Sequence, residues 1–433
     1  MKLLLGICAV ALWYLYRLSI RLRASPASRS SRLNAHCSSD LSSAAADELE
    51  SVSYKDIDMM KAIPPVTHSG YAVVGGSGFL GTYLIRLLIL RGETCIRILD
   101  VAPPPPHILD HPSVSFVKTD ITSLESVRAA LTQPFLLTGS PPSVIYHTAA
   151  TIRFWERASY CWDTTYRVNV IGTQNVLTVA KELPSAMVIY TSSVETVAGC
   201  PKFMRIDWDT CPVSIRDDDR PPAYILKQGC YARSKRMAEQ LVISASVNDG
   251  LKTGILRPGH VIMGPNDPLI SMTLTMPRLP VWDQLWTSTN ICVWDCAAAP
   301  LRTSCTHLEL AEYILTLRKH YATRVLIFDE VPPLLIYALA HAIELFLWLR
   351  YHLLLPFALL RGTRPSVTPK WLGQAVFLQP TTLDGQLVDC IVDDSRARKV
   401  LGYAPQWDTP PCIRYTVDEI QSGNVAAVHG LKV

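Results

Sequence analysis

The sequence predicts an α/β fold organised around a doubly wound parallel sheet, and three observations point to it. Short apolar runs alternate with helix-like stretches from Tyr71 onward. A glycine-rich turn joins the first run to the first helix, and a carboxylate ends the second run. Strands that alternate with helices form a parallel sheet with helices on both faces. The six expected strands cover residues 71–74, 95–99, 114–117, 143–146, 187–191 and 254–256.

The stretch YAVVGGSGFLG at 71–81 predicts a phosphate-binding turn. A strand that runs through a tight glycine turn into a helix N-terminus has the geometry that holds a pyrophosphate. Gly75 permits the turn, Gly78 lets the backbone approach the phosphates, and Gly81 lets helix and strand pack closely. These residues predict a Rossmann-type dinucleotide site, with its helix over residues 79–91.

Asp100 and Asp120 end the next two expected strands, and both are candidates for binding the adenosine half of the dinucleotide. Asp100 stands 19 positions after Gly81, where dinucleotide sites place the acceptor for the ribose hydroxyls. It would repel a 2′-phosphate, which favours NAD over NADP; alternatively, Asp100 is a turn residue before the prolines at 103–106. Asp120 is a candidate partner of the adenine amino group. It could also cap a helix over 123–131, and the two roles are compatible.

The composition excludes some classes of protein and directs attention to membranes. The chain has 433 residues, enough for one large domain or two. A net charge of +4 without a dense basic block gives nucleic-acid binding no support. Twelve cysteines without a CxxC pair or zinc spacing suit reduced thiols in a cytosol-facing protein, so we expect no structural disulfide and no metal. With 49% hydrophobic and only 18% charged residues, the chain is apolar for a soluble enzyme.

Two apolar segments are candidates for membrane association. Residues 3–20 predict an N-terminal membrane anchor within 1–23, with a cleaved signal peptide as the alternative. A flexible Ser/Ala/Arg-rich tether (24–67) would lead to a catalytic domain (68–300) and a C-terminal substrate region (301–433). Within that region, 334–360 is apolar but interrupted by His341, Glu344 and Pro356, so we expect it to lie in one leaflet. A buried core helix is the alternative.

The strongest catalytic signal is the sequence YARSK at 231–235. Tyr231 and Lys235 lie on one helical face, so the ammonium can approach the phenol. For Tyr231 to act as a base near neutrality, its pKa must fall from about 10 to near 7, which takes about 4 kcal/mol. A Lys⁺ and a positive nicotinamide ring can together supply that amount in a partly desolvated site. The phenolate would then take the proton of an alcohol as hydride leaves for the nicotinamide.

Other polar residues surround this pair. Ser193 follows the strand at 187–191 and could bond the substrate oxygen, with Ser192 or Thr191 in support. The alternative is a polar strand end that caps the next turn. Asn169 would hold backbone or a proton-relaying water, unless it is simply exposed to solvent. We interpret His147 as a structural residue at a strand end rather than as a base.

These motifs together resemble the extended short-chain dehydrogenase/reductase family. The resemblance covers roughly 71–300 and rests on GGSGFLG (75–81), HTAA (147–150), NVIGTQNV (169–176), YTSS (190–193), YARSK (231–235) and LRPGHVIMGPND (256–267), with Asp100 and Asp120-Ile121. Within the family, YTSSVETVAG (190–199), the apolar segment 334–360 and DDSRARKVLGYAP (393–405) resemble the 3β-hydroxysteroid dehydrogenase branch, which includes the sterol-4α-carboxylate 3-dehydrogenases.

The resemblance implies an NAD-dependent enzyme that oxidises a 3β-hydroxyl on a sterol or related terpenoid to the 3-ketone. A 4α-carboxyl group on the substrate would make the product a β-keto acid, which loses CO₂. It also implies the endoplasmic reticulum membrane as the location, with the catalytic domain facing the cytosol; a homodimer is left open. The expected catalytic residues are Tyr231, Lys235 and Ser193. The expected NAD-binding residues are Gly75, Gly76, Ser77, Gly78, Phe79, Leu80, Gly81, Asp100, Asp120, Ile121, Ala149, Tyr231, Lys235 and Pro258.

Two other functions stay open at this point. A nucleotide-sugar epimerase or dehydratase would use the same scaffold but would need a polar pocket for a diphosphate and has no evident use for hydrophobic anchors. The second is a membrane-tethered NAD-binding protein without turnover. It is suggested by the stretch 297–323, which is shorter than in the family that the chain resembles.

Overall fold

The computed structural model describes most of the chain between residues 53 and 422. The described residues are 53–61, 63–197, 213–215, 229–259, 261–265, 267, 278–281, 287–298, 306–309, 327–330, 333–386, 390–392, 398–399, 406–407 and 409–422, with residues 6, 9 and 13–16 near the N-terminus. Most of the expected anchor and most of the expected tether therefore lie outside the described residues.

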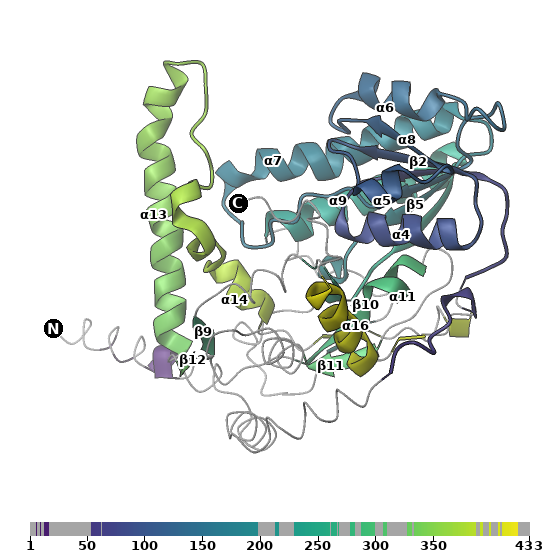
Figure 1. Cartoon of the computed structure of the whole chain (residues 1–433). Coiled ribbons are helices and arrows are strands. Elements are labelled where there is room, and N and C mark those ends of the chain that lie inside the picture. Colours follow the sequence, from purple (N-terminus) through teal and green to yellow (C-terminus); the bar gives the residue numbers. More distant parts are fainter. Residues whose placement is uncertain are drawn as a thin grey trace.

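A six-stranded parallel sheet forms the centre of the fold (Figure 1). Its strands are β1 (Gly70–Val74), β2 (Cys95–Asp100), β3 (Val114–Lys118), β4 (Val144–His147), β5 (Met187–Thr191) and β7 (Lys252–Leu256). They lie in the order β3-β2-β1-β4-β5-β7, which is a doubly wound arrangement. The sequence placed each strand within two residues of these bounds. The prediction of a Rossmann-type fold is confirmed.

Helices cover both faces of this sheet. On one face, α4 (Phe79–Leu90) shares a hydrophobic core with α11 (Val293–Ala298) and α16 (Thr409–Gln421). On the other face lie α6 (Leu124–Thr132), α8 (Gly172–Glu182) and α9 (Cys230–Asp249), with their own core. A short helix, α5 (Pro106–Leu109), follows β2. Both faces of the central strands are therefore buried, which agrees with their nearly continuous apolar sequences.

One of the two roles predicted for Asp120 is to cap α6, but the structure shows a different capping residue. The hydroxyl of Ser123 accepts the hydrogen bond from Ser126 N, so Ser123 is the N-cap. Asp120 lies outside the helix, where its Oδ1 accepts hydrogen bonds from Thr122 N (2.9 Å) and Thr122 Oγ1 (2.8 Å). The capping interpretation of Asp120 is wrong, because a serine nearer to the helix start takes that place.

The long helix between β4 and β5 contains a wide turn. It runs from α7 (Trp162–Tyr166) through a π-helical turn (Arg167–Ile171) into α8 without a break. A π-turn inserts an extra residue into the helix and is frequent at functional sites. Asn169 lies in this turn and is buried.

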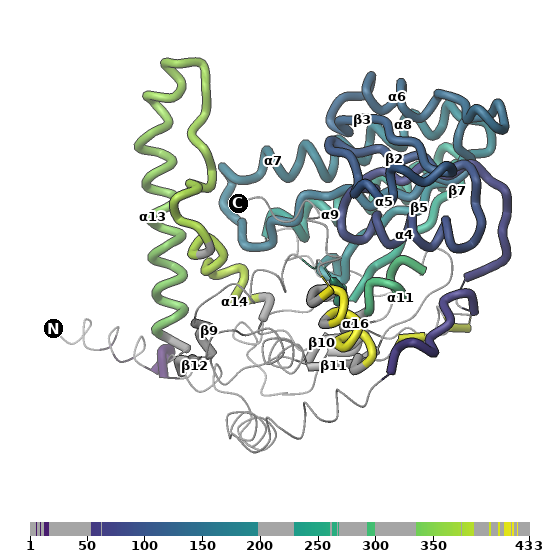
Figure 2. The backbone as a smooth tube through the Cα atoms, in the orientation of Figure 1, coloured from purple at the N-terminus to yellow at the C-terminus, as the bar shows by residue number. Residues whose placement is uncertain are grey.

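A second sheet joins segments that are far apart in the sequence (Figure 2). Strands β6 (Val213–Ile215), β8 (Val261–Met263), β10 (Thr287–Cys292), β11 (Thr306–Glu309) and β13 (Cys390–Val392) form it, while β9 (Arg278–Val281) pairs with β12 (Ile327–Glu330). Most of the short stretch 297–323 lies outside the described residues. Tyr54, which we assigned to the tether, packs against Trp407 and Tyr415 and donates to Asp418. Residues around Tyr54 therefore belong to the folded domain.

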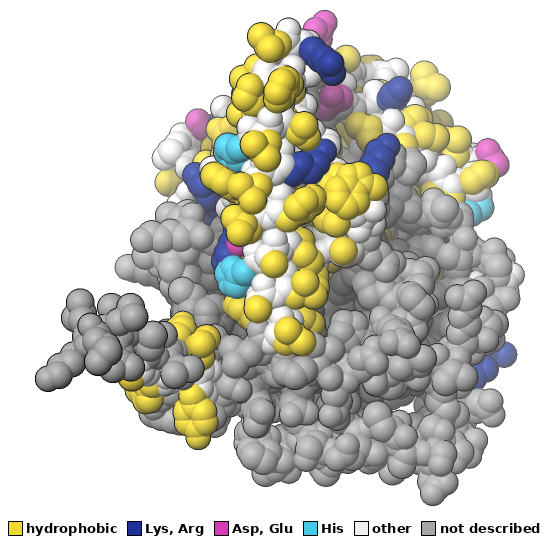
Figure 3. Space-filling model, turned by 90° about the vertical axis from the view of Figure 1, so that its left-hand side faces the viewer, with side chains coloured by type: hydrophobic (Ala, Val, Ile, Leu, Met, Phe, Trp, Pro, Cys, Tyr) yellow, Lys and Arg dark blue, Asp and Glu magenta, His cyan; other side chains and the backbone are white. Residues whose placement is uncertain are grey.

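The apolar segment in the C-terminal region is one helix, α13 (Pro333–Leu359), which stands along one side of the molecule (Figure 1). Pro356 interrupts the apolar sequence, but the helix continues through it. The buried-core alternative is wrong, since only 11% of its most apolar window is buried. By length and composition alone, Leu335–Leu359 could cross a membrane. Figure 3 shows hydrophobic side chains gathered along its outer face.

The inner side of α13 contacts the catalytic domain through a single stripe. Ile336, Ala340, Leu347 and Tyr351 are buried at helical spacing. Leu347 packs with Trp155, and Tyr351 stacks on Tyr160 at 4.4 Å between ring centroids. Between these contacts, Arg157 donates two hydrogen bonds to Glu344 at 2.6 and 2.7 Å. The helices after it, η7 (Lys370–Phe377) and α14 (Pro380–Gln386), lie beside it.

Candidate active site

The glycine turn lies at the carboxyl end of β1, in the middle of the sheet. Gly75 has a φ of +84°, and its N–H donates to Leu99 O at 2.8 Å. A Cβ on Gly81 would lie 2.2 Å from Gly75 O, so any side chain there would push the helix away from the turn. Gly78 is the N-cap of α4, and no side chain caps that helix. Its first N–H groups are therefore available to an anion, as a pyrophosphate site requires.

Asp100 lies beside this turn, at the end of the neighbouring strand β2. Its Oδ2 accepts a hydrogen bond from Ser77 N at 3.1 Å, and its Oδ1 accepts one from Val101 N at 2.7 Å. The hydroxyl of Ser77 donates to Ala102 O at 2.7 Å. The carboxylate is thus fixed at the edge of the glycine turn. The turn, the uncapped helix and this carboxylate are the three parts that a dinucleotide site needs.

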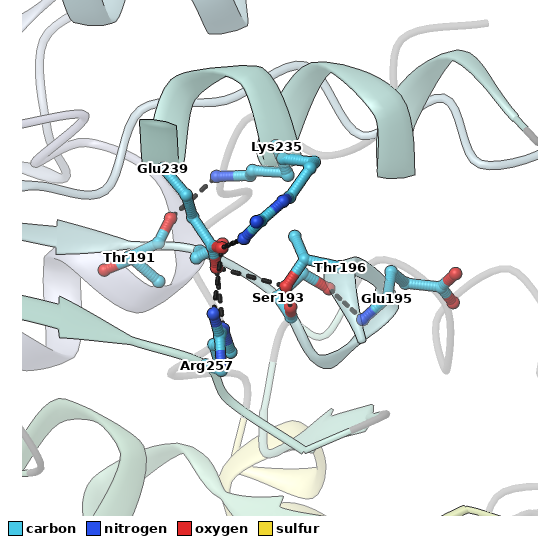
Figure 4. Close-up of polar contacts among 9 residues, drawn as sticks. Thr191, Ser193, Glu195, Thr196, Lys235, Glu239 and Arg257 are labelled. Carbon is cyan, nitrogen blue, oxygen red and sulfur yellow. Dashed lines mark hydrogen bonds and ion pairs between the residues drawn. The ribbon is translucent and has the colours of Figure 1, made fainter. Parts of the chain in front are cut away.

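The three expected catalytic residues are brought together at the carboxyl end of β5, and Figure 4 shows two of them, Ser193 and Lys235. Tyr231 and Lys235 face the sheet from the first turns of α9, and both are buried. Lys235 Nζ donates to Thr191 O at 2.7 Å and lies 6.0 Å from the centre of the Tyr231 ring. The hydroxyl of Ser193 forms a hydrogen bond with Tyr231. A phenol, an ammonium and a hydroxyl therefore converge, as the spacing in the sequence predicts.

The electrostatics of the trio differ from the prediction. Burial raises the pKa of Tyr231, and the hydrogen bond from Ser193 acts in the opposite direction. Burial also lowers the pKa of Lys235 to about 7, against the attraction of Glu239. In the protein alone, the phenol is therefore harder to ionise than a free tyrosine. Burial is the main cause, and the Lys235 ammonium donates its hydrogen bond to the Thr191 carbonyl.

Sequence reasoning missed the residue with the most polar contacts near the trio, Glu239. Its side chain is fully buried on α9. Its Oε1 accepts hydrogen bonds from Ser192 Oγ (2.6 Å), Thr196 Oγ1 (3.1 Å) and Arg257 Nε (2.8 Å). Its Oε2 accepts from Arg236 Nη1 and Arg257 Nη2, both at 3.0 Å. A signal was present in the sequence, because residues 231, 235 and 239 are spaced by four on one helical face.

The charge on Glu239 is stabilised by these partners. Burial raises the pKa of its carboxyl group, but the hydrogen bonds and charge of Arg257, with the hydroxyls of Ser192 and Thr196, bring it below the usual value. Two positive side chains and two hydroxyls therefore surround one buried carboxylate, which is the condition under which such a charge is tolerated.

Asn169 and His147 connect neighbouring segments. The side chain of Asn169 accepts from Thr151 N at 2.8 Å and donates to Thr151 O at 3.0 Å and to Ser234 Oγ at 2.9 Å. It thus holds backbone, one of the roles predicted for it. His147 Nε2 lies 3.0 Å from Thr173 Oγ1, and burial, with the charge of Lys235, lowers its pKa to about 3. A neutral, buried imidazole in this position suits a structural role.

The remaining predicted cofactor residues border the same edge of the sheet. A Cβ on Gly75 would lie 2.5 Å from Ala149 N, so the two strand ends touch. Ile121 fills the space above Gly172, and Pro258 O accepts from Val194 N at 3.2 Å. Gly75, Ile121, Ala149 and Pro258 thus follow the carboxyl ends of β1, β3, β4 and β7, the edge where open parallel sheets bind their ligands.

Comparisons with known proteins agree with this arrangement. The model of the 3-beta hydroxysteroid dehydrogenase/isomerase family matches residues 72–277. A 3 beta-hydroxysteroid dehydrogenase/Delta 5→4-isomerase of Vaccinia virus (strain Ankara) is 33% identical over 213 residues, which are 47% of this chain and 55% of that protein. The 3 beta-hydroxysteroid dehydrogenase type 7 of Mus musculus is 32% identical over 45% of this chain and 52% of its own length. The chain spans about half the length of these two relatives.

A fungal relative aligns over more of the chain. The decarboxylating sterol-4-alpha-carboxylate 3-dehydrogenase of Candida albicans is 27% identical over 370 residues, which are 80% of this chain and 96% of that protein. Among solved structures, an epimerase from Methanothermobacter thermautotrophicus has a TM-score of 0.55 at 15% identity, covering 85% of this chain and 95% of its own. UDP-glucose 4-epimerase from Thermotoga maritima has a TM-score of 0.53 at 16% identity, covering 82% and 99%. At such identities, these structures show the fold alone.

The family model covers the glycine turn, β1 to β7, and all three residues of the trio. The resemblance that the motifs indicate is thereby confirmed. Residues 72–277 match the model of the 3-beta hydroxysteroid dehydrogenase/isomerase family.

Proposed function

We propose that this chain is an NAD-dependent 3β-hydroxysteroid dehydrogenase that oxidises the 3β-hydroxyl of a sterol or related terpenoid to the 3-ketone. The observation that supports this most is the burial of Tyr231, Lys235 and Ser193 together at the carboxyl end of β5, on the same edge of the sheet as the glycine turn. The relatives named above supply the class of substrate. NAD rather than NADP is favoured by Asp100 beside the turn.

In this proposal each residue of the trio has a separate task. Ser193 donates a hydrogen bond to the substrate oxygen and orients it toward Tyr231. The Tyr231 phenolate takes the hydroxyl proton while the C–H bond of the carbinol breaks and its carbon becomes a carbonyl. Bound NAD⁺ supplies the hydride acceptor. Lys235, when protonated, lowers the cost of ionising Tyr231. Burial makes that assistance necessary, because it raises the pKa of the phenol.

A carboxyl group at C4 of the substrate would add a second step. The 3-ketone would then be a β-keto acid, in which the C4–carboxyl bond breaks and the ketone accepts the electron pair as CO₂ leaves. The similarity to the decarboxylating Candida albicans enzyme supports this extension. It requires no further catalytic residue beyond those that make the ketone.

We also propose that the outer face of α13 lies in the cytosolic leaflet of the endoplasmic reticulum membrane. A helix that crossed the bilayer would be surrounded by lipid or other helices. Here one stripe of α13 contacts the catalytic domain, and an ion pair with Arg157 lies midway along it. Leu353 and Phe357 on the opposite side are 68% and 67% exposed. An in-plane helix places the active site where sterols partition.

The test uses microsomes that express the chain, supplied with NAD and a 3β-hydroxysterol. We expect NADH and the 3-ketone from the wild type, and neither from Tyr231→Phe, which should still bind NAD. Tyr146→Phe, which removes a buried phenol oxygen from β4, serves as the control and should remain active. NAD binding without turnover of any sterol by the wild type would instead indicate a scaffold protein.

Cofactor choice has its own test. Asp100→Ala removes the carboxylate that would repel a 2′-phosphate, so the ratio of kcat/KM with NAD to that with NADP should fall. Asp110→Ala, an exposed carboxylate just after α5, is the matched control. An unchanged ratio in Asp100→Ala would exclude Asp100 from the ribose site.

A further inference from the structure

Ser193 depends on its neighbours for its position. A hydroxyl that contacts both substrate and Tyr231 cannot also be tied to a structural partner by its own proton. In the structure the Ser193 oxygen accepts a hydrogen bond from Glu195 N at 3.3 Å, a long contact within the same turn. Ser192 and Thr196, on either side of it, are both held by the carboxylate of Glu239.

The backbone geometry explains why the carboxylate of Glu239 can bind residues on both sides of Ser193. Ser193 is extended, with φ −159° and ψ 148°, so the side chains of residues 192 and 193 point in opposite directions. Ser192 points to Glu239 Oε1 while Ser193 points to Tyr231. The chain then turns, and the Thr196 hydroxyl lies 2.9 Å from Ser193 O and 3.1 Å from Glu239 Oε1.

Glu239 is itself fixed from two elements. Arg257, which follows β7, makes two hydrogen bonds to its two oxygens, and Arg236 adds one from the same helix. The backbone reinforces this arrangement, since Ser192 N donates to Leu256 O at 2.7 Å. The strand end that carries Ser193 is thereby joined to α9, which carries Tyr231. Figure 4 labels Glu239, Arg257 and Thr196 of this network, together with Ser193 and Lys235.

We propose that Glu239 is a positioning residue for the alcohol oxidation: by binding Ser192 and Thr196 on either side of Ser193, it sets the Ser193 hydroxyl against Tyr231. This inference rests on the proposed function, because it assigns a task to a residue that does not touch the substrate. Glu239 acts through Ser193. Its removal should therefore change the rate of the chemical step and leave NAD binding as it is.

Two substitutions at Glu239 distinguish its role in positioning Ser193 from the effect of its negative charge. Glu239→Ala removes every contact, and a displacement of Ser193 by about 1 Å would lower kcat about 100-fold. Glu239→Gln keeps an oxygen that can accept from Ser192, Thr196 and Arg257, so most of the activity lost in the alanine variant should return. The dissociation constant of NAD, measured by titration, should be unchanged in both. Ser192→Ala removes one of the two supports and should show a smaller fall in kcat.

The chain offers a matched control at the other end of the sheet. Glu93 is also buried, and it is paired with Arg91 at 2.9 Å. Glu93→Gln should lower the melting temperature, as we also expect of the Glu239 variants, but leave kcat per folded molecule unchanged. If Glu239→Ala does not fold, Glu239→Gln and Ser192→Ala carry the test.

The outcomes distinguish this inference from the function on which it rests. Unchanged kcat in Glu239→Ala and Ser192→Ala, with Tyr231→Phe inactive, would overturn the positioning role and leave the proposed function standing. An equal fall in kcat per folded molecule in Glu93→Gln would also overturn it, because the effect would then be one of general stability. Full activity of Tyr231→Phe would remove the proposed function itself.

Discussion

Two buried glutamate–arginine pairs lie at opposite ends of the central sheet, and they have the same chemistry but different neighbours. At the amino end, Glu93 pairs with Arg91 and accepts from Thr67 N at 2.9 Å. Arg91 also donates to the Tyr71 hydroxyl at 2.6 Å. At the carboxyl end, Glu239 pairs with Arg257. Both glutamate side chains are fully buried.

The difference lies in what each pair holds in place. The partners of Glu93 belong to the start of β1 and the segment before it, far along the strand from the glycine turn. The hydroxyl partners of Glu239 flank Ser193. A buried ion pair is weak evidence for function by itself, since structural networks also contain them. The Glu239–Arg257 pair is relevant to the chemistry because it lies at the carboxyl ends of the strands, where such sheets bind their ligands.

The largest expected effect comes from removing the arginine of either pair. Arg257→Met and Arg91→Met each leave a buried carboxylate without its main partner, which costs about 3–5 kcal/mol of unfolding free energy. Urea unfolding followed by circular dichroism measures this loss. Only Arg257→Met should also lower kcat per folded molecule. If Arg91→Met lowered kcat to the same degree, the two ends of the sheet would not be functionally distinct.

A smaller effect is expected from removing one hydroxyl at each end. Thr196→Val and Tyr71→Phe each delete a hydrogen bond near a carboxylate and should cost about 1.5–3 kcal/mol. We expect turnover to fall in Thr196→Val and to stay at the wild-type value in Tyr71→Phe. Steady-state kinetics with saturating NAD checks this, and equal turnover in both variants would contradict the role assigned to Thr196.

The smallest expected effect is a difference in acid stability. The pKa of Glu239 in the folded protein is lower than its ordinary value of 4.5. Its charged form therefore stabilises the fold above that pH, and this contribution is lost as the pH falls through the folded pKa. Glu239→Gln has no charge to lose, so its stability does not fall in this way. The difference in unfolding free energy between wild type and variant should therefore narrow below pH 4.5. Unfolding at a series of pH values measures the gap, and a constant gap would contradict the lowered pKa.

The sheet and the trio were predictable because their signals are local. Each strand is a short apolar run, and the glycine turn and YARSK lie within eleven and five consecutive residues. Glu239 was missed although it continues the same spacing, because a glutamate on a helix is usually exposed and nothing in its own sequence says that Arg257 covers it. Long-range partners of this kind become visible only in the folded chain.

Two other regions could not be predicted for different reasons. The second sheet joins residues 213–215 to residues 390–392, and such distant pairing leaves no local pattern in the sequence. His341, Glu344 and Pro356 interrupt the apolar sequence of α13, but the helix itself is continuous. Arg350 extends to Ser366, and Pro356 lies in the last turn, where losing one helical hydrogen bond costs little. Sequence patterns overestimate such interruptions when the helix end can absorb them.

The contact between Gly75 and Ala149 limits how an NAD-deficient form of this protein can be engineered. A side chain at position 75 would meet the backbone of Ala149 at 2.5 Å, so it would spread β1 and β4 apart at the point where both strands end. Such a variant would confuse loss of cofactor with damage to the sheet. A shorter side chain at position 100 would instead remove the hydrogen bonds to Ser77 N and Val101 N without pushing on neighbouring backbone.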